Sequence, residues 1–380
     1  MQSRRGFFKS ALGGVWTGAA VIDQALLRAV RARAQSTTLP DLFDFTKAAD
    51  GVYLAVARPQ TVLNSNAVIF ENSRDLLIMD SHSKPSAVAV LVRQIRRQIS
   101  EKPVRYVVAS HFHWDHSHGL PAFRRIAPHA DIVSSQVTRK LIDQETVPRL
   151  KASFDTLRAS MDGYRKNAAS AGSPGEKAHW DRMRRETDDY IREMQNFAPE
   201  LPNVTVDRDL ILHDKAHDLH LAFRGRGHTS GDVIVYCPQK KVVASGDLLH
   251  GFFPFLGDGY PLDWPTTLHH FAQFEFTHIA GGHGPLHERS RIYQMANYIE
   301  ELTELVVRGK RAGKPQVQVE AEITPDKLKT LADGGYGRTT AESILKLRQW
   351  PPAKPAAETV IADTVKINVG HIFAALDKNP

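Results

Sequence analysis

The sequence has a single cysteine, Cys237, among its 380 residues, which excludes an intrachain disulfide framework and a cysteine-rich zinc module. It also lacks any run of the ~20 apolar residues that a membrane-spanning helix needs, so we expect no stable membrane insertion. The composition is not that of a disordered chain, because 42% of the residues are hydrophobic and 24% are charged. The length allows one large domain or two ordinary ones.

The first 34 residues have the features of an export signal. Arg4 and Arg5 are followed by two phenylalanines and a lysine, then by a mildly apolar stretch over residues 11–22. Ala32-Arg33-Ala34 is the small-x-small pattern that signal peptidase cuts. The adjacent arginines resemble a twin-arginine signal, which implies bacterial export of the folded chain by the twin-arginine translocase. We therefore expect a periplasmic or secreted protein; the alternative is a basic helix that stays attached.

The excess of positive charge belongs mostly to this segment. The whole chain has 49 basic and 42 acidic residues, a net charge of +7. Residues 1–34 hold six of the basic residues and one of the acidic ones, which leaves 43 and 41 in the mature chain. A net charge of +2 gives no reason to expect a nucleic-acid partner.

Short β-branched segments, bounded by polar, proline or glycine residues, indicate strands in both halves of the mature chain. A helical pattern over residues 86–99 separates two of them, and together they predict an α/β body of sheets covered by helices. The predicted strands are 52–56, 67–70, 76–79 and 104–108, then 219–223, 233–236, 242–244 and 277–280.

Two segments outside this pattern are predicted to be helical. Apolar residues recur every three or four positions over 147–164 and 180–197, and Ser173, Pro174 and Glu176 form a helix start between them. We expect a helical hairpin inserted at about 140–198 and packed on its own domain; a lid over the active site and a dimer contact are alternatives. Residues 311–380 are expected to form a helical C-terminal appendage to a domain spanning 35–310. Its last helix, 362–376, has four apolar residues available for docking: Val365, Ile367, Val369 and Ile372.

The 18 histidines are the informative excess. His111, His113, Asp115 and His116 directly follow the predicted strand 104–108, and nitrogen and oxygen ligands of this kind suit zinc. Residues two apart in an extended turn point the same way, so His111 and His113 are able to bind one ion together. Asp115 and His116 then turn towards a second position.

Three more ligand candidates lie at the ends of predicted strands in the second half. His228 precedes a strand and offers a third histidine for the first ion. Asp247 follows a strand and offers a carboxylate that is able to bridge two metals, and His283 completes the second ion. His118, His250 and His287, taken singly, are interpreted as structural.

Asp80 precedes these candidate ligands in the sequence. In this order, Asp80 and the ligand motifs resemble those of the metallo-β-lactamase superfamily, over about residues 50–290. The resemblance implies an αββα sandwich, two mixed sheets with helices outside and metals at one edge, here with the hairpin insertion and the helical tail added. It implies two Zn²⁺ per chain, with iron or manganese as alternatives, and support of the site by Asp80 from outside the ligand set. The ligands implied are His111, His113 and His228 for the first ion, Asp115, His116 and His283 for the second, and Asp247 between them.

The expected reaction is hydrolysis of a small-molecule ester, lactone, thioester or β-lactam. Two ions about 3.5–4 Å apart share a water and lower its pKa towards 7, which supplies hydroxide for attack on a carbonyl. Asp115 is expected to orient the hydroxide or pass on its proton, so Asp115 and Asp247 are the catalytic candidates. The alternatives are a β-lactamase in the narrow sense, an iron-dependent sulfur dioxygenase on the same fold, and a non-catalytic binding protein. The oligomeric state stays open, a homo-oligomer included.

Two variations and one loop bear on the subclass. His113 stands where oxygen-reducing di-iron relatives carry glutamate, and Asp247 stands where one large subclass of zinc β-lactamases carries cysteine. An aspartate there resembles thioesterases of the glyoxalase II type and lactonases, although His250 occupies the position of a tyrosine common in lactonases. Residues 250–260 are aromatic and glycine-rich, and are expected either to form an apolar wall for substrate or to pack under the sheet.

Overall fold

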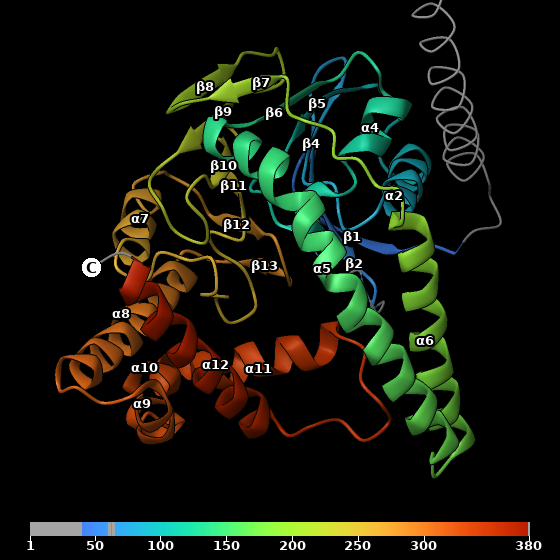
Figure 1. Ribbon diagram of the computed structural model, residues 1–380. Coiled ribbons are helices and arrows are strands. Elements are labelled where there is room, and N and C mark those ends of the chain that lie inside the picture. Colours follow the sequence, from blue (N-terminus) through green and yellow to red (C-terminus); the bar gives the residue numbers. More distant parts are fainter. Residues whose placement is uncertain (1–39, 60–61, 63–64, 379–380) are drawn as a thin grey trace, which may run out of the picture.

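The computed structural model describes residues 40–59, 62 and 65–378 (Figure 1). The predicted export signal, residues 1–34, lies outside the described residues. The described chain forms two sheets with helices on their outer sides.

The first sheet has seven strands in the order of the sequence. β1 to β4 pair antiparallel, whereas β4 to β7 pair parallel, so the sheet is mixed. Its strands are β1 (Phe43–Ala49), β2 (Val52–Ala57), β3 (Ala67–Glu71), β4 (Leu76–Met79), β5 (Val104–Val108), β6 (Asp131–Ser135) and β7 (Val204–Val206).

The second sheet has six strands in the order β13-β12-β11-β10-β9-β8. All neighbours are antiparallel except β11 and β12, which are parallel. Its strands are β8 (Asp209–Leu212), β9 (Leu219–Phe223), β10 (Val233–Cys237), β11 (Val242–Gly246), β12 (His278–Gly281) and β13 (Leu286–His287).

Three hydrophobic layers hold the sheets and helices together. Buried residues of both sheets, such as Leu54, Leu221 and Cys237, form the middle layer. On the outer face of the first sheet lie α2 (Pro85–Gln98) and α4 (Leu120–Ile126), and on that of the second lie α7 (Trp264–Phe271) and α8 (Ser290–Arg311). This is the αββα sandwich that the sequence predicted, and all eight predicted strands are present within two residues of their expected ends.

The predicted insertion is a hairpin of two long helices, α5 (Gln136–Ala169) and α6 (Pro174–Met194). The amide of Glu176 donates to Ser173 Oγ at 3.2 Å, so the predicted cap is present. The inner part of the hairpin packs against the domain through a hydrophobic cluster that contains Val62, Leu150 and Tyr190. The far end extends beyond the two sheets (Figure 1).

The C-terminal region is helical and shares a core with the second sheet. It comprises α9 (Gln316–Glu322), α10 (Lys329–Ala332), α11 (Tyr336–Leu347) and α12 (Ala357–Lys378), with short 3-10 turns at Pro325–Lys327 and Asp333–Gly335. Tyr336, Val365 and Val369 belong to the same buried cluster as Trp264 of α7. Ile367, which we expected among the docking residues, is instead 55% exposed.

One helix of the described chain, α12, has the length and apolar composition of a membrane span. An 18-residue window within Ala357–Asp377 has a mean hydropathy of 1.2, and 28% of that window is buried. A helix that packs into a core passes the same test, and Val365, Val369 and Ile372 of α12 are buried. Length and composition therefore give only weak evidence for a span.

Candidate metal centre

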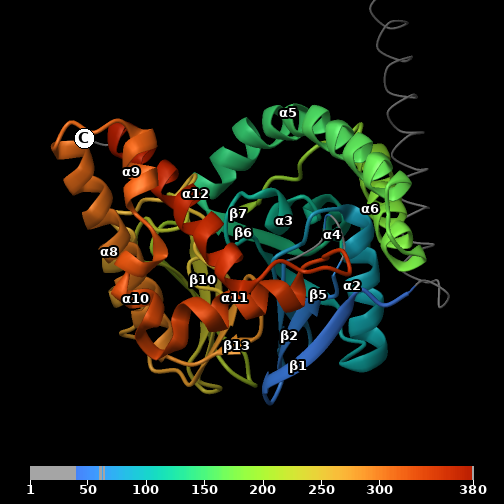
Figure 2. The ribbon, with the colours of Figure 1, turned by 90° about the horizontal axis from the view of Figure 1, so that it is seen from below.

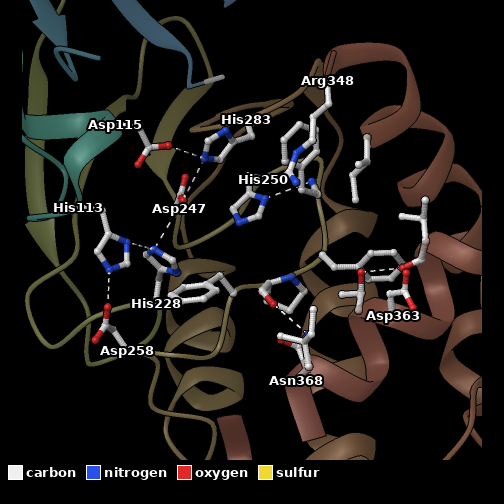
Figure 3. Close-up of a pocket in the computed structure, with 18 of the residues that line it drawn as sticks. His113, Asp115, His228, Asp247, His250, Asp258, His283, Arg348, Asp363 and Asn368 are labelled. Atoms are coloured by element: carbon white, nitrogen blue, oxygen red, sulfur yellow. Dashed lines mark hydrogen bonds and ion pairs between the residues drawn. The ribbon is translucent and has the colours of Figure 1, made fainter. Parts of the chain in front are cut away.

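Loops at one edge of the sandwich bring the seven predicted ligand residues together. The segment containing His111 to His116 follows β5 and includes the short helix α3 (Trp114–Ser117). Asp247 follows β11 and His283 follows β12, while His228 precedes β10. Strand ends from both sheets therefore meet at a single site (Figure 3).

The seven side chains form three overlapping groups, in each of which the possible ligand atoms lie within 4.8 Å of one another. Asp247 lies between the groups: Oδ1 is 3.3 Å from His116 Nε2, and Oδ2 is 3.2 Å from His283 Nε2 and 3.5 Å from His228 Nε2. The assignment of particular ions to these residues stays a prediction. The groups are His111, His113 and His228; His111, His116 and Asp247; and Asp115, His116 and His283.

Asp80 orients this cluster from outside the seven residues. It follows β4 in the left-handed backbone region, with φ of 71°. Its carboxylate accepts hydrogen bonds from the Ser110 amide at 2.9 Å, the Ser110 hydroxyl at 3.0 Å and His116 Nδ1 at 2.8 Å. A proton held on Nδ1 leaves the His116 Nε2 lone pair directed at the centre, as a metal ligand requires.

Asp258 has the same relation to His113 and was not predicted from the sequence. Its Oδ2 lies 2.9 Å from His113 Nε2, and Arg149 of α5 contacts both of its oxygens, at 2.7 and 3.0 Å. Burial acts to raise the pKa of Asp258, but the hydrogen bonds of His113 and Arg149 outweigh burial and lower it well below its usual range. His113 is thereby held with Nδ1 towards His228 Nε2, 2.8 Å away.

The nitrogens and oxygens of the cluster fit a divalent cation. Burial, with further contributions from neighbouring histidines, lowers the pKa of His111 and His228 well below the ordinary value, so both rings are neutral and have a free lone pair. Burial also acts to lower the pKa of His116, but the carboxylates of Asp247, Asp115 and Asp80 outweigh it and raise that pKa, so the negative charge that favours a proton on Nε2 equally favours a metal ion in its place. His111 Nε2 is buried without a hydrogen-bond partner among the described residues. Unpartnered imidazole nitrogens beside carboxylates are the ligand set of zinc.

Two glycines allow the loops that carry the predicted ligands to approach one another closely. A Cβ on Gly282 would lie 2.1 Å from Asp247 Oδ1 and 2.9 Å from His116 Cε1. Gly246, directly before Asp247, has φ of +52°, and a Cβ there would lie 2.5 Å from Ser110. Any larger residue at either position would displace a predicted ligand or its support.

Comparison with known proteins agrees with this geometry. The family model of the Metallo-beta-lactamase superfamily matches residues 61–278, more than half of the chain. This chain belongs to the metallo-β-lactamase superfamily. One curated relative, a "Metallo-beta-lactamase type 2" from Elizabethkingia meningoseptica, is 20% identical over 243 residues, which cover 62% of this chain and 76% of that protein.

Solved structures of the superfamily are also similar. A metallo-beta-lactamase from Pontibacter korlensis is 19% identical with a TM-score of 0.49, and covers 68% of this chain and 99% of its own. One from Erythrobacter litoralis is 16% identical with a TM-score of 0.49, and covers 69% and 98%. His283 and the C-terminal helices lie beyond the last residue of the superfamily match.

The superfamily site opens into a cavity of about 780 Å³. The predicted ligands His113, Asp115, His228, Asp247 and His283 line one side of it (Figure 3). Within residues 250–260, Phe252 and Phe253 are buried, whereas Phe255 is 45% exposed and its ring centre lies 6.0 Å from that of His113. All three phenylalanines line the cavity, so the aromatic loop forms an apolar wall while two of its rings are also packed in the core.

Proposed function

We propose that this protein is a metal-dependent hydrolase that binds two Zn²⁺ and cleaves a carbonyl compound: an ester, a lactone, a thioester or a β-lactam. The observation that carries the proposal is the position of Asp247. Its carboxylate lies 3.5 Å from His228, predicted for the first ion, and 3.3 and 3.2 Å from His116 and His283, predicted for the second. A carboxylate in that position is suited to join two ions into one centre.

The residues of the chain have distinct parts in the proposed reaction. Two zinc ions, when bound, lower the pKa of a shared water and polarise the substrate carbonyl. Asp115 Oδ2 lies 3.4 Å from His283 Nε2 and lines the cavity, so this carboxylate is placed to hold a proton between the centre and the substrate. Asp80 and Asp258 keep the histidine rings oriented.

A β-lactamase in the narrow sense is the second candidate, supported by the similarity to the metallo-beta-lactamase type 2 from Elizabethkingia meningoseptica. It differs from the first candidate only in substrate. A panel of β-lactams, lactones, thioesters and phosphoesters, assayed with metal analysis on the same sample, separates the two. A protein that contains one iron and no zinc would instead be assigned to the dioxygenase class.

Asp247→Ala is the decisive variant for the centre. We expect it to lose at least one zinc equivalent and to lower kcat by about 100-fold or more, on the scale of losing an electrostatic stabiliser. Asp218→Ala, which removes an exposed carboxylate paired with His213, is the matched control and should retain both zinc and activity. An Asp247→Ala protein with full activity would show that the centre is misassigned.

We further propose that residues 1–34 direct export by the twin-arginine route. A reporter fused to residues 1–40 should be exported, and export should stop when Arg4 and Arg5 are both replaced by lysine. Replacement of Arg31 and Arg33 by lysine, outside the pair, is the control. Export that continues without the arginine pair would refute this assignment.

A further inference from the structure

The C-terminal helices form the wall of the cavity opposite the metal centre. Ile344, Arg348, Trp350, Val360, Ile367 and Asn368 all line it, and all lie beyond the superfamily match. Figure 3 shows Arg348 and Asn368 approaching the cavity from the side away from His113. The superfamily domain alone therefore does not complete the space in which substrate would lie.

Specific contacts hold this wall in place. Asn368, which is buried, donates from Nδ2 to the carbonyl of Pro254 at 3.0 Å, on the loop that follows Asp247. Gln349 donates to Glu186 of α6 at 2.8 Å, so the segment after α11 reaches across to the hairpin (Figure 2). Arg291 of α8 donates both to Thr340 of α11 and to the carbonyl of His250. These bonds connect the C-terminal helices to the site loop on one side and to the hairpin on the other.

Two arginines line the cavity, and their surroundings differ. Arg149 is neutralised by its two contacts with Asp258. The side chain of Arg348 makes no hydrogen bond or ion pair with any described residue; its guanidinium carbon lies 5.4 Å from the ring centre of Phe252. The ring of Phe252 in turn stacks on His283 at 5.1 Å. Arg348 is thus an unpaired cation one aromatic ring away from a predicted metal ligand.

The other charges around Arg348 leave room for an anion. Burial by the surrounding protein lowers the pKa of Arg348, whereas the Asp115 carboxylate acts to raise it. Solvent still reaches the side chain. Arginine stays protonated across the physiological range in any case. Asp115 and Asp247 belong to the metal cluster and Asp258 to Arg149. Asp363, exposed on α12, is the remaining carboxylate that lines the cavity.

We propose that Arg348 binds a carboxylate of the substrate, so that the enzyme selects anionic carbonyl compounds with an apolar body. A planar guanidinium is able to donate two parallel hydrogen bonds to a carboxylate, which a neutral substrate cannot accept in the same way. Phe255 and Ile367, both exposed and both lining the cavity, supply apolar surface in the same space as Arg348. This inference rests on the proposed hydrolase function and names its substrate class.

The test compares two esters that differ only in charge: 4-carboxyphenyl butanoate and its carboxamide, 4-carbamoylphenyl butanoate. For the zinc-loaded wild type we expect kcat/KM to favour the carboxylate. Arg348→Met should lower that preference at least 10-fold, because kcat/KM falls for the carboxylate ester and stays the same for the carboxamide ester. Arg348→Lys should restore part of the preference. Asp363→Asn, which removes a negative charge from the same cavity, should raise the preference for the carboxylate ester. Lys346→Met, near the end of α11 and outside the cavity, should leave kcat/KM for both esters unchanged.

A binding measurement separates failure of this inference from failure of the proposed function. 4-Butanamidobenzoate and its carboxamide replace the ester by an amide, and calorimetry records their binding without turnover. If wild type hydrolyses neither these esters nor any compound of the substrate panel, the hydrolase proposal fails, while loss of 4-butanamidobenzoate binding in Arg348→Met would still support the role of Arg348. If both esters are hydrolysed and Arg348→Met leaves their ratio and the binding unchanged, the inference is overturned.

Discussion

At the scale of single residues, the centre depends on carboxylates that do not belong to the ligand cluster itself. Asp80 orients His116, and Asp258 orients His113 while Arg149 holds Asp258. Such partners fix the ring orientation and the tautomer of a metal-binding histidine, and so change metal affinity indirectly.

Asp258→Asn tests this arrangement. The amide oxygen is still able to accept from His113, but the negative charge and the ion pair with Arg149 are lost. We expect zinc affinity or kcat to fall by about 10- to 100-fold with the fold retained. The measurement is zinc competition with a chelator, and Asp209→Asn, which breaks the ion pair with Arg224 at the edge of the second sheet, is the matched control. Equal losses in both variants would contradict a specific role for Asp258.

The burial of His82 leads to a prediction about how the stability of the fold depends on pH. It is fully buried, and burial, together with the nearby charge of His116, lowers its pKa to about 3. The unfolded chain binds a proton at this residue below about pH 6.5 and the folded chain does not, so stability falls as the pH falls. Between pH 6.5 and pH 5 this one residue should remove about 1.5 kcal/mol from the free energy of unfolding.

His82→Asn removes the titrating ring. Asparagine tolerates the left-handed backbone, with φ of 61°, that His82 adopts. Urea unfolding of both proteins at equal metal content and at several pH values should give a flatter pH dependence for the variant, whatever its stability at pH 7. Parallel curves would show that His82 is protonated in the folded protein.

At the scale of elements, local sequence signals predicted the ends of the hairpin better than its place in the fold. The Ser173 cap and the heptad-like spacing are both local. That α5 supplies Arg149 to the site depends on a contact with Asp258, 109 residues away. The strands that were not predicted are β1, β6, β7, β8 and β13; in β1 and β6, polar residues interrupt the β-branched pattern.

Ser173→Ala should loosen the start of α6 without affecting the centre. Loss of a serine cap costs about 1 kcal/mol, because the amide of Glu176 is left without its acceptor. Hydrogen exchange at the first turn of α6 should therefore be faster, while activity stays unchanged. Ser160→Ala, at a half-buried position within α5, is the control and should leave that exchange unaltered. Slow exchange at α6 in Ser173→Ala would mean that the cap contributes nothing measurable.

At the scale of the whole molecule, the C-terminal helices and the second sheet share one hydrophobic core. Val365, Val369 and Ile372 of α12 belong to the cluster that includes Trp264 and Ile299. A shared core predicts that α12 unfolds together with the domain, in a single transition. The helices also complete the cavity wall, so stability and substrate selection both involve the same region.

Two isoleucines of α12 provide a matched test. Ile372→Ala empties a fully buried position and should lower the free energy of unfolding by about 2–4 kcal/mol, with one transition retained. Ile367→Ala, at a side chain that is 55% exposed, should change it by less than about 0.5 kcal/mol. Urea unfolding followed by circular dichroism measures both. An early, separate loss of helix in Ile372→Ala would show that α12 is independent of the domain.

The sequence by itself determined the fold class and the candidate ligands, because the strand patterns and the histidine motif at the end of β5 are local and strongly patterned. It could not determine that Asp258 lies against His113, 145 residues away, or that Arg348 faces the same cavity. Neither residue has a spacing signal, since each reaches the site through loop geometry and helix packing. Those contacts exist only once two sheets, a hairpin and the C-terminal helices close around one space, and that closure is a property of the tertiary structure.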